Sequence, residues 1–165
     1  MTLVESLLPE FDHEMATTRK LLERVPDDRL GWKPHAKSWS LGQLAQHVAT
    51  IPLWGGVALT QSELDITTTT APEPAASRMD LLRTFDASVS GTRVALVGCT
   101  DDALLTPWAL RRGTQPMFSM PKLMVWRSFV MNHLVHHRGQ LALYLRMNDV
   151  LVPPIYGPSA DESAF

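Results

Sequence analysis

The chain has 165 residues, 45% of them hydrophobic and 19% charged, with a net charge of −2 and a single cysteine, Cys99. This length and composition predict one folded domain over residues 1–165 and exclude a disordered chain or a fold held by internal disulfides. The slight acidity argues against the basic surface that nucleic acid requires, and no apolar run reaches the roughly 20 residues of a membrane-spanning helix.

The first predicted helix covers about residues 3–25. Its apolar positions recur in steps of three and four, as one face of a helix requires. They are Leu7, Phe11, Met15, Thr18, Leu22 and Val25. Thr2 and Glu5 have the spacing of a capping box. Proline is tolerated without a kink only in a first turn, so we expect the regular helix to begin near Pro9.

The second predicted helix begins at a capping box formed by Ser40 and Gln43 and ends near Leu64. Its apolar stripe includes one histidine, His47, together with Trp54, which we expect to be plain core. Residues 67–74 contain four threonines and two prolines, a composition that predicts a loop.

The third predicted helix opens at a capping signal of Ser77 and Asp80 and ends at Gly98. Residues 99–120 then form a long connection without strand-like alternation of useful length. Connections this long inside compact domains are typical of lids or binding loops. Trp108 lies in this connection and is the best candidate among the tryptophans to line a pocket.

The fourth predicted helix starts near Ser119 or Pro121 and runs to about Asn148, before an irregular tail that includes residues 152–158. Its predicted inward stripe consists of Leu123, Trp126, Val130, His133, His137, Gln140 or Leu141, and Tyr144. Four helices with long connections and an irregular tail predict an all-α fold, a four-helix bundle.

Three of the six histidines fall on predicted inward stripes. His133 and His137 are four residues apart and therefore share one helix face, and His47 occupies the stripe of another helix. Bundles build metal sites from facing helices, and three imidazoles with room for water are typical of an open divalent site. Nitrogen ligands suit Zn²⁺, Ni²⁺, Fe²⁺ or Cu²⁺. The alternative is polar histidines bonded to backbone or water at a wet end of the bundle.

Other polar side chains have less specific interpretations. Arg138 falls off the stripe and is expected to face solvent or a flanking helix. Gln140, three residues after His137, either supports that ring or packs at the rim of the bundle. His13 and His35 lie off the stripe and in a loop, respectively, and are expected to be solvated.

Three segments resemble the DinB family of metal-binding four-helix bundles: WSLGQLAQHVA (39–49), HLVHHRGQLALYLR (133–146) and PPIYGPSADE (153–162). The resemblance extends over essentially the whole chain. It implies a divalent metal held by His47, His133 and His137, the same three residues that the stripes select. Zinc or nickel is the expected metal, with iron as a further candidate.

The resemblance also implies a function, because the family includes bacillithiol S-transferases and mycothiol-dependent maleylpyruvate isomerases. We therefore expect a cytoplasmic homodimer that uses its metal to activate a low-molecular-weight thiol for attack on a small-molecule electrophile. A metal-dependent hydrolase using a metal-bound hydroxide is one alternative. A non-enzymatic stress- or damage-response protein with an incidental metal site is the other. No catalytic residue is identified beyond the metal ligands, and the sequence does not decide between these classes.

Overall fold

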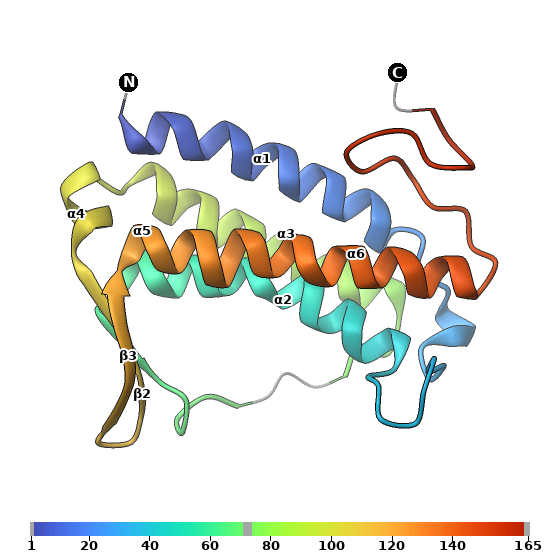
Figure 1. Ribbon diagram of the computed structural model, residues 1–165, viewed down its shortest axis with the longest axis horizontal. Helices are drawn as coiled ribbons and strands as arrows, with labels where there is room; N and C mark the ends of the chain where they lie inside the picture. Colours follow the sequence, from blue (N-terminus) through green and yellow to red (C-terminus); the bar gives the residue numbers. More distant parts are fainter. Residues whose placement is uncertain (1, 71–73, 164–165) are drawn as a thin grey trace.

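Four long helices lie side by side in the computed structural model, which describes residues 2–70 and 74–163 (Figure 1). They are α1 (Leu3–Leu22), α2 (Leu41–Thr60), α3 (Arg78–Val97) and a last helix built from α5 (Lys122–Val125), the π-helical segment η2 (Trp126–Met131) and α6 (Asn132–Met147). A short 3-10 turn, η1 (Asp27–Arg29), lies between α1 and α2. The four-helix bundle predicted from the sequence is confirmed.

The first helix begins earlier than its proline suggests. The capping box is present: Glu5 N donates to Thr2 Oγ1 (3.1 Å) and Thr2 N donates to Glu5 Oε2 (2.7 Å). Leu3 N donates to Asp101 Oδ1 (2.9 Å) and ties the first turn to the start of the connection that follows α3. These bonds satisfy amides that a helix start leaves unpaired, so α1 starts at Leu3 with Pro9 inside it. The expected start near Pro9 was wrong.

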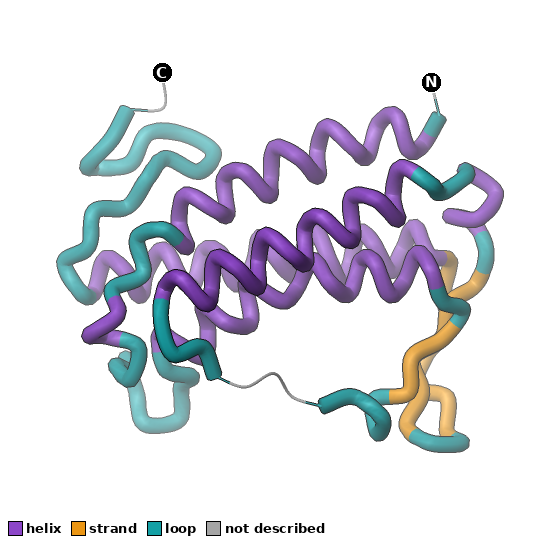
Figure 2. Tube along the Cα trace, turned by 180° about the vertical axis from the view of Figure 1, so that it is seen from behind, coloured by secondary structure: helices purple, strands orange, loops and turns teal. Residues whose placement is uncertain are grey.

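The connection after α3 contains regular structure that the sequence did not reveal. It forms α4 (Asp101–Leu105) and a hairpin of β2 (Pro107–Arg112) and β3 (Gln115–Pro121), turned at Gly113, whose φ is +58°. β1 (Glu63–Asp65) pairs in parallel with β2, giving the order β1-β2-β3 at one end of the bundle (Figure 2). The expectation of no strands was therefore wrong, although the fold remains mainly helical. The predicted loop at 67–74 falls partly outside the described residues, at 71–73.

Apolar side chains from all four long helices meet in one core. The six positions that the sequence placed on the inner face of the first helix are all buried. Phe11 packs on Trp126, with ring centroids 5.3 Å apart. Trp108 belongs to a smaller cluster with Ala58 and Val125, under the hairpin. It lines a small cavity of about 40 Å³ there, but not the large cavity described below.

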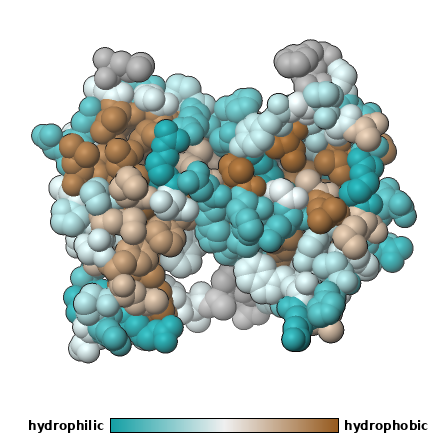
Figure 3. Space-filling view, viewed as in Figure 1, coloured by the Kyte–Doolittle hydropathy of each residue, from teal (hydrophilic) through white to brown (hydrophobic). Residues whose placement is uncertain are grey.

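The surface is uneven in polarity. Figure 3 shows polar groups across the middle of one face and apolar groups over the end that carries α4, α5 and the hairpin. Exposed apolar side chains of these elements include Leu105, Met117 and Met124. In the described part of the chain, no helix combines the length and the hydropathy needed to cross a membrane. The homodimer expected from the sequence stays a prediction.

Candidate metal centre

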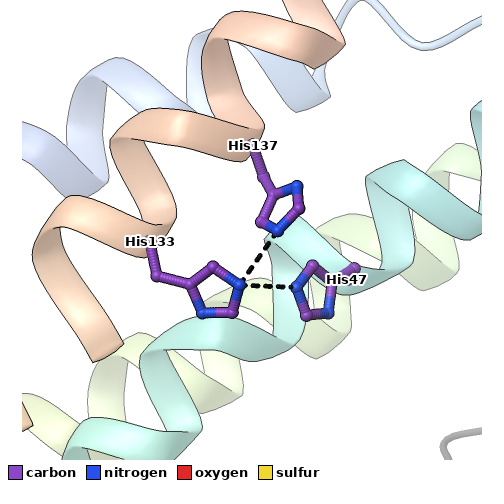
Figure 4. Close-up of side chains that lie close together, drawn as sticks. All are labelled: His47, His133 and His137. Atoms are coloured by element: carbon purple, nitrogen blue, oxygen red, sulfur yellow. Dashed lines mark hydrogen bonds between the residues drawn. The ribbon is translucent and has the colours of Figure 1, made fainter. Parts of the chain in front are cut away.

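Three imidazoles from two helices converge on one point (Figure 4). His47 comes from α2, and His133 and His137 come from successive turns of α6. His133 Nε2 lies 3.2 Å from His47 Nε2 and 2.9 Å from His137 Nε2. Each histidine offers one ring nitrogen, and these three nitrogens all lie within 4.8 Å of one another. The structure thus brings together the three histidines that the sequence singled out.

The helix places these histidines beside the core instead of inside it. The buried residues of α6 are Leu134, Arg138, Leu141 and Leu145. The buried line is therefore displaced by one residue from the predicted stripe, and His133 and His137 lie at its edge, facing α2. All three histidines are half-buried. An imidazole at such a margin keeps one nitrogen accessible to a ligand while its ring packs against the bundle.

Hydrogen bonds on the outer side of two rings fix their tautomers. His133 Nδ1 donates to the Phe129 carbonyl oxygen (3.3 Å), and His137 Nδ1 donates to Gln140 Oε1 (2.8 Å). A ring that carries its proton on Nδ1 has a lone pair on Nε2. With this tautomer, the Nε2 lone pairs of His133 and His137 face each other at 2.9 Å, an arrangement that a shared cation would stabilise. The hydrogen bond from His137 also agrees with the first of the two interpretations of Gln140, in which this side chain supports the ring.

The donor set fits a divalent cation of the zinc type. Tetrahedral coordination with metal–nitrogen bonds of about 2.0–2.1 Å places the ligand nitrogens about 3.3 Å apart, close to the separations around His133. No carboxylate or thiolate joins the cluster among the described residues. Three neutral ligands leave the full charge of a divalent ion uncompensated and one tetrahedral position open. Such an arrangement is suited to binding an anionic or polarisable group.

The environment keeps all three imidazoles neutral near pH 7. Burial is the largest cause that lowers the pKa of His47 to about 4, with further contributions from His137 and then His133. Burial also lowers the pKa values of His133 and His137, against the opposing effect of their outer hydrogen bonds. Metal ligands must be deprotonated, so these shifts favour metal binding.

Trp39 covers the cluster from outside and was not identified from the sequence. Its indole stacks on the His137 ring (centroids 5.7 Å apart, 24° between planes) and meets the His47 ring edge-on at 4.9 Å. The side chain is 47% exposed despite its size. The available signal was its position directly before the Ser40 cap, which fixes the residue at the start of α2, the helix that carries His47.

A cavity of about 600 Å³ adjoins the centre and includes His47 in its wall. It lies between one face of α2 and the segment of residues 64–70. Trp54 lines it and is 40% exposed, so the expectation that Trp54 is plain core was wrong. The volume is within the roughly 300–1,000 Å³ of small-molecule sites. The cluster of histidines therefore stands at the border of a space large enough for an organic substrate.

The remaining sequence candidates lie away from the centre. His13 and His35 are exposed, as expected. Arg138 faces the flanking helix α1, where only 1% of it is exposed, and not solvent.

The sequence as a whole agrees with this geometry. The model of the DinB family matches residues 1–164. The chain belongs to the DinB family. It is 26% identical to the uncharacterized protein YrdA of Bacillus subtilis (strain 168) over 165 residues, which cover 98% of this chain and 92% of that protein.

Solved structures of other DinB-like proteins share the fold. One, from Bacillus cereus ATCC 10987, has a TM-score of 0.73 and 25% identity, covering 94% of this chain and 98% of its own. Another, YjoA from Bacillus subtilis, has a TM-score of 0.72 and 18% identity, covering 97% and 99%. These likenesses extend over nearly the whole length of each protein, so this DinB-family chain shares their architecture as well as the family sequence pattern.

Proposed function

We propose that this protein is a divalent-metal-dependent enzyme that activates a small thiol for attack on an electrophile held in the adjacent cavity. The observation that carries the proposal is the meeting of three imidazole Nε2 atoms, with those of His137 and His47 at 2.9 and 3.2 Å from that of His133. His47, His133 and His137 would hold the metal, with zinc or nickel as the expected ion. A divalent ion in such a site supplies positive charge that lowers the pKa of a coordinated thiol.

The protein's own residues have defined roles in this reaction. The Phe129 carbonyl and Gln140 orient two of the rings, and Trp39 shields the site from part of the solvent. The cavity beside His47 keeps the electrophile next to the open side of the centre. In the transfer, the thiol proton leaves to solvent, the sulfur forms a bond to the electrophilic carbon, and the leaving group departs with its bonding electrons.

The first experiment measures metal by mass spectrometry in untagged wild-type protein and in His47→Ala, His133→Ala and His137→Ala. Near-stoichiometric metal in the wild type and its loss from all three variants is the expected result. His13→Ala is the matched control, because His13 is exposed on α1 and far from the cluster in sequence. A wild type that contains no metal and takes none up on reconstitution would contradict the metal centre.

The second experiment tests the reaction with metal-loaded protein. A chromogenic chloronitroarene is offered with cysteine, glutathione, coenzyme A, bacillithiol or mycothiol, and release of chloride and formation of the thioether are followed. Conjugation with at least one thiol, absent in His47→Ala, is expected. Full metal loading without conjugation by any thiol would overturn the thiol reaction. Hydrolysis of neutral esters without added thiol would instead indicate a hydrolase.

A further inference from the structure

The cavity beside His47 has a wall of uniform chemical character. Aromatic and aliphatic side chains, among them Trp39, Leu53, Trp54 and Val57, form much of it. Besides the His47 imidazole, its polar lining consists of amides and threonine hydroxyls, and none of its described lining residues is Asp, Glu, Lys or Arg. Away from the metal centre at His47, an ion in this cavity would lose hydration without gaining a countercharge from the described lining residues, which is strongly unfavourable. The cavity therefore favours an uncharged ligand.

Basic residues nearby do not change this conclusion. Arg111 lies in β2, which pairs with β1 at the edge of the cavity, but its guanidinium is held by Glu63 (3.2 Å) and by the Thr114 carbonyl (3.2 Å). Lys122 donates to the Leu59 carbonyl oxygen (2.8 Å) and is itself buried. Both cations already have protein partners, and neither is among the described residues that line the cavity.

One buried polar group in the wall lacks a partner. The Gln46 side chain is only 8% exposed, and its Oε1 has no hydrogen-bond partner among the residues described. Buried polar atoms are almost always paired, so an unpaired amide in a cavity wall points to a ligand that supplies the missing bond. The terminal torsion of glutamine is soft, so the amide can turn toward an incoming donor. Gln46 directly precedes His47, which places this bond close to the metal centre.

We propose that this cavity binds the body of an uncharged, mainly apolar substrate, preferably aromatic, through a hydrogen-bond donor that pairs with Gln46. The inference rests on the proposed function and gives the substrate class of that enzyme. The aromatic faces of Trp39 and Trp54 supply contact area for a ring, and Gln46 fixes its orientation relative to His47. Gln46 is thus a specificity-determining residue and takes no part in the chemical step.

Binding of four probes with one ring system tests the proposal by calorimetry. They are 2-naphthol, 2-methoxynaphthalene, 2-naphthoate and 2-naphthylmethylammonium, which differ in charge and in the ability to donate. Metal-free and zinc-loaded wild-type protein are both titrated, because a carboxylate can bind zinc directly. In metal-free protein, we expect the neutral probes to bind at least about tenfold more tightly than either ion. Among the neutral pair, 2-naphthol should bind more tightly than 2-methoxynaphthalene.

The variant Gln46→Met, similar in shape but without the amide, tests the orienting bond. We expect it to weaken 2-naphthol binding about tenfold and to leave 2-methoxynaphthalene binding and zinc content unchanged. Gln61→Met, at the exposed C-terminal cap of α2, is the control. Equal affinity for neutral and charged probes in the wild type, or binding of none of them, would overturn the proposal whether or not the variant folds. So would unchanged 2-naphthol binding in Gln46→Met.

These outcomes separate the two proposals. Zinc content reports on the metal centre, and probe binding to metal-free protein reports on the cavity alone. Loss of probe selectivity with stoichiometric zinc would refute the substrate class and leave the metal-dependent enzyme standing. Selective probe binding in a protein that takes up no metal would refute the metal-dependent enzyme and leave the ligand preference of the cavity standing.

Discussion

At the scale of single residues, the centre depends on imidazoles that stay unprotonated although they stand close together. His47 contacts the rings of both other ligands, with centroids 4.9 Å from His133 and 4.5 Å from His137. Protonating one of them places a partly buried charge beside the other two rings. Burial and this mutual effect explain the depressed pKa of His47, about 4. The exposed His136, which contacts His137, adds to the same effect on that ring.

This depression predicts that the metal-free protein loses stability in mild acid. Between pH 6.5 and about 4 the unfolded chain protonates His47 while the folded chain does not, so unfolding takes up protons and stability falls as the pH falls. The melting temperature of metal-free wild type should therefore decrease across this range more steeply than that of His47→Leu. His13→Leu, at an exposed site, should follow the wild type. Parallel pH profiles for wild type and His47→Leu would contradict the explanation.

The outer hydrogen bond of His137 gives a second prediction. Gln140 is exposed, so Gln140→Leu should leave the fold intact while removing the acceptor that holds Nδ1–H. Loss of such an outer partner lowers metal affinity by about 10–100-fold. Competition with a chromogenic zinc chelator measures the change, and Gln61→Leu serves as the control. An affinity equal to that of the wild type would mean that Gln140 only packs at the rim.

The ligand residues were predictable from the sequence, but their surroundings were not. The spacing of His133 and His137 and the position of His47 depend only on helix periodicity. Trp39 and Gln46 owe their roles to the way α2 lies against α6 and against residues 64–70, contacts that no local pattern encodes. The one-residue displacement of the buried line in α6 has a similar origin. The π-helical segment η2 precedes α6 and adds an extra residue to the turn, which breaks a strict 3.6-residue period.

At the scale of elements, β1 contributes Leu64 to the far wall of the cavity, and the hairpin supports that wall by pairing with β1. β2 pairs with β1, which lies more than 40 residues earlier in the chain. In this pairing Ala109 lies opposite Glu63. Strands this short, with Pro116 inside the hairpin, carry little alternation of their own. Their existence depends on pairing between distant segments, which explains why the sequence indicated only a long connection. The four long helices, by contrast, each carry their own periodicity, and α1, α2 and α3 also carry their own capping signals.

Asp65 connects β1 to the turn of the hairpin and to Thr67, and these contacts give a third prediction. Its Oδ1 accepts from Gly113 N, Thr67 N and Thr67 Oγ1, at 2.9, 2.9 and 2.8 Å. These bonds, with Gly113 first, lower the pKa of the carboxyl. Asp65→Ala should speed hydrogen exchange at the amides of Thr67 and Gly113 and weaken 2-naphthol binding several-fold, with zinc content unchanged.

Glu63→Ala is the matched control for that variant. Glu63 is on the same strand but contributes only an exposed ion pair with Arg111, which is worth little. In Glu63→Ala, the hydrogen-exchange rates at the amides of Thr67 and Gly113 should remain those of the wild type. Equal exchange rates and probe affinity in Asp65→Ala and wild type would show that the wall is held by strand pairing alone.

At the scale of the whole molecule, a polar network of buried Arg138 and Glu14 with the exposed Tyr156 joins α6, α1 and the tail. Arg138 pairs with Glu14 of α1 (2.6 Å) and donates to the hydroxyl of Tyr156 in the tail (2.6 Å). That hydroxyl in turn donates to the Glu14 carboxylate (3.0 Å), and the guanidinium lies over the Tyr156 ring at 5.0 Å. Because Arg138 directly follows His137, the network also fixes the register of the metal-binding turn against α1.

The last prediction concerns the stability that this network controls. Arg138→Met leaves the Glu14 carboxylate buried without its cation, and breaking a buried pair from one side destabilises a protein by about 3–5 kcal/mol. Replacing both charges, in Glu14→Met with Arg138→Met, removes the unpaired charge and should recover much of the loss. Urea denaturation of the single and double variants measures both free energies of unfolding. A double variant no more stable than Arg138→Met would mean that the loss of stability arises from the packing of the arginine stem and not from the unpaired Glu14 carboxylate.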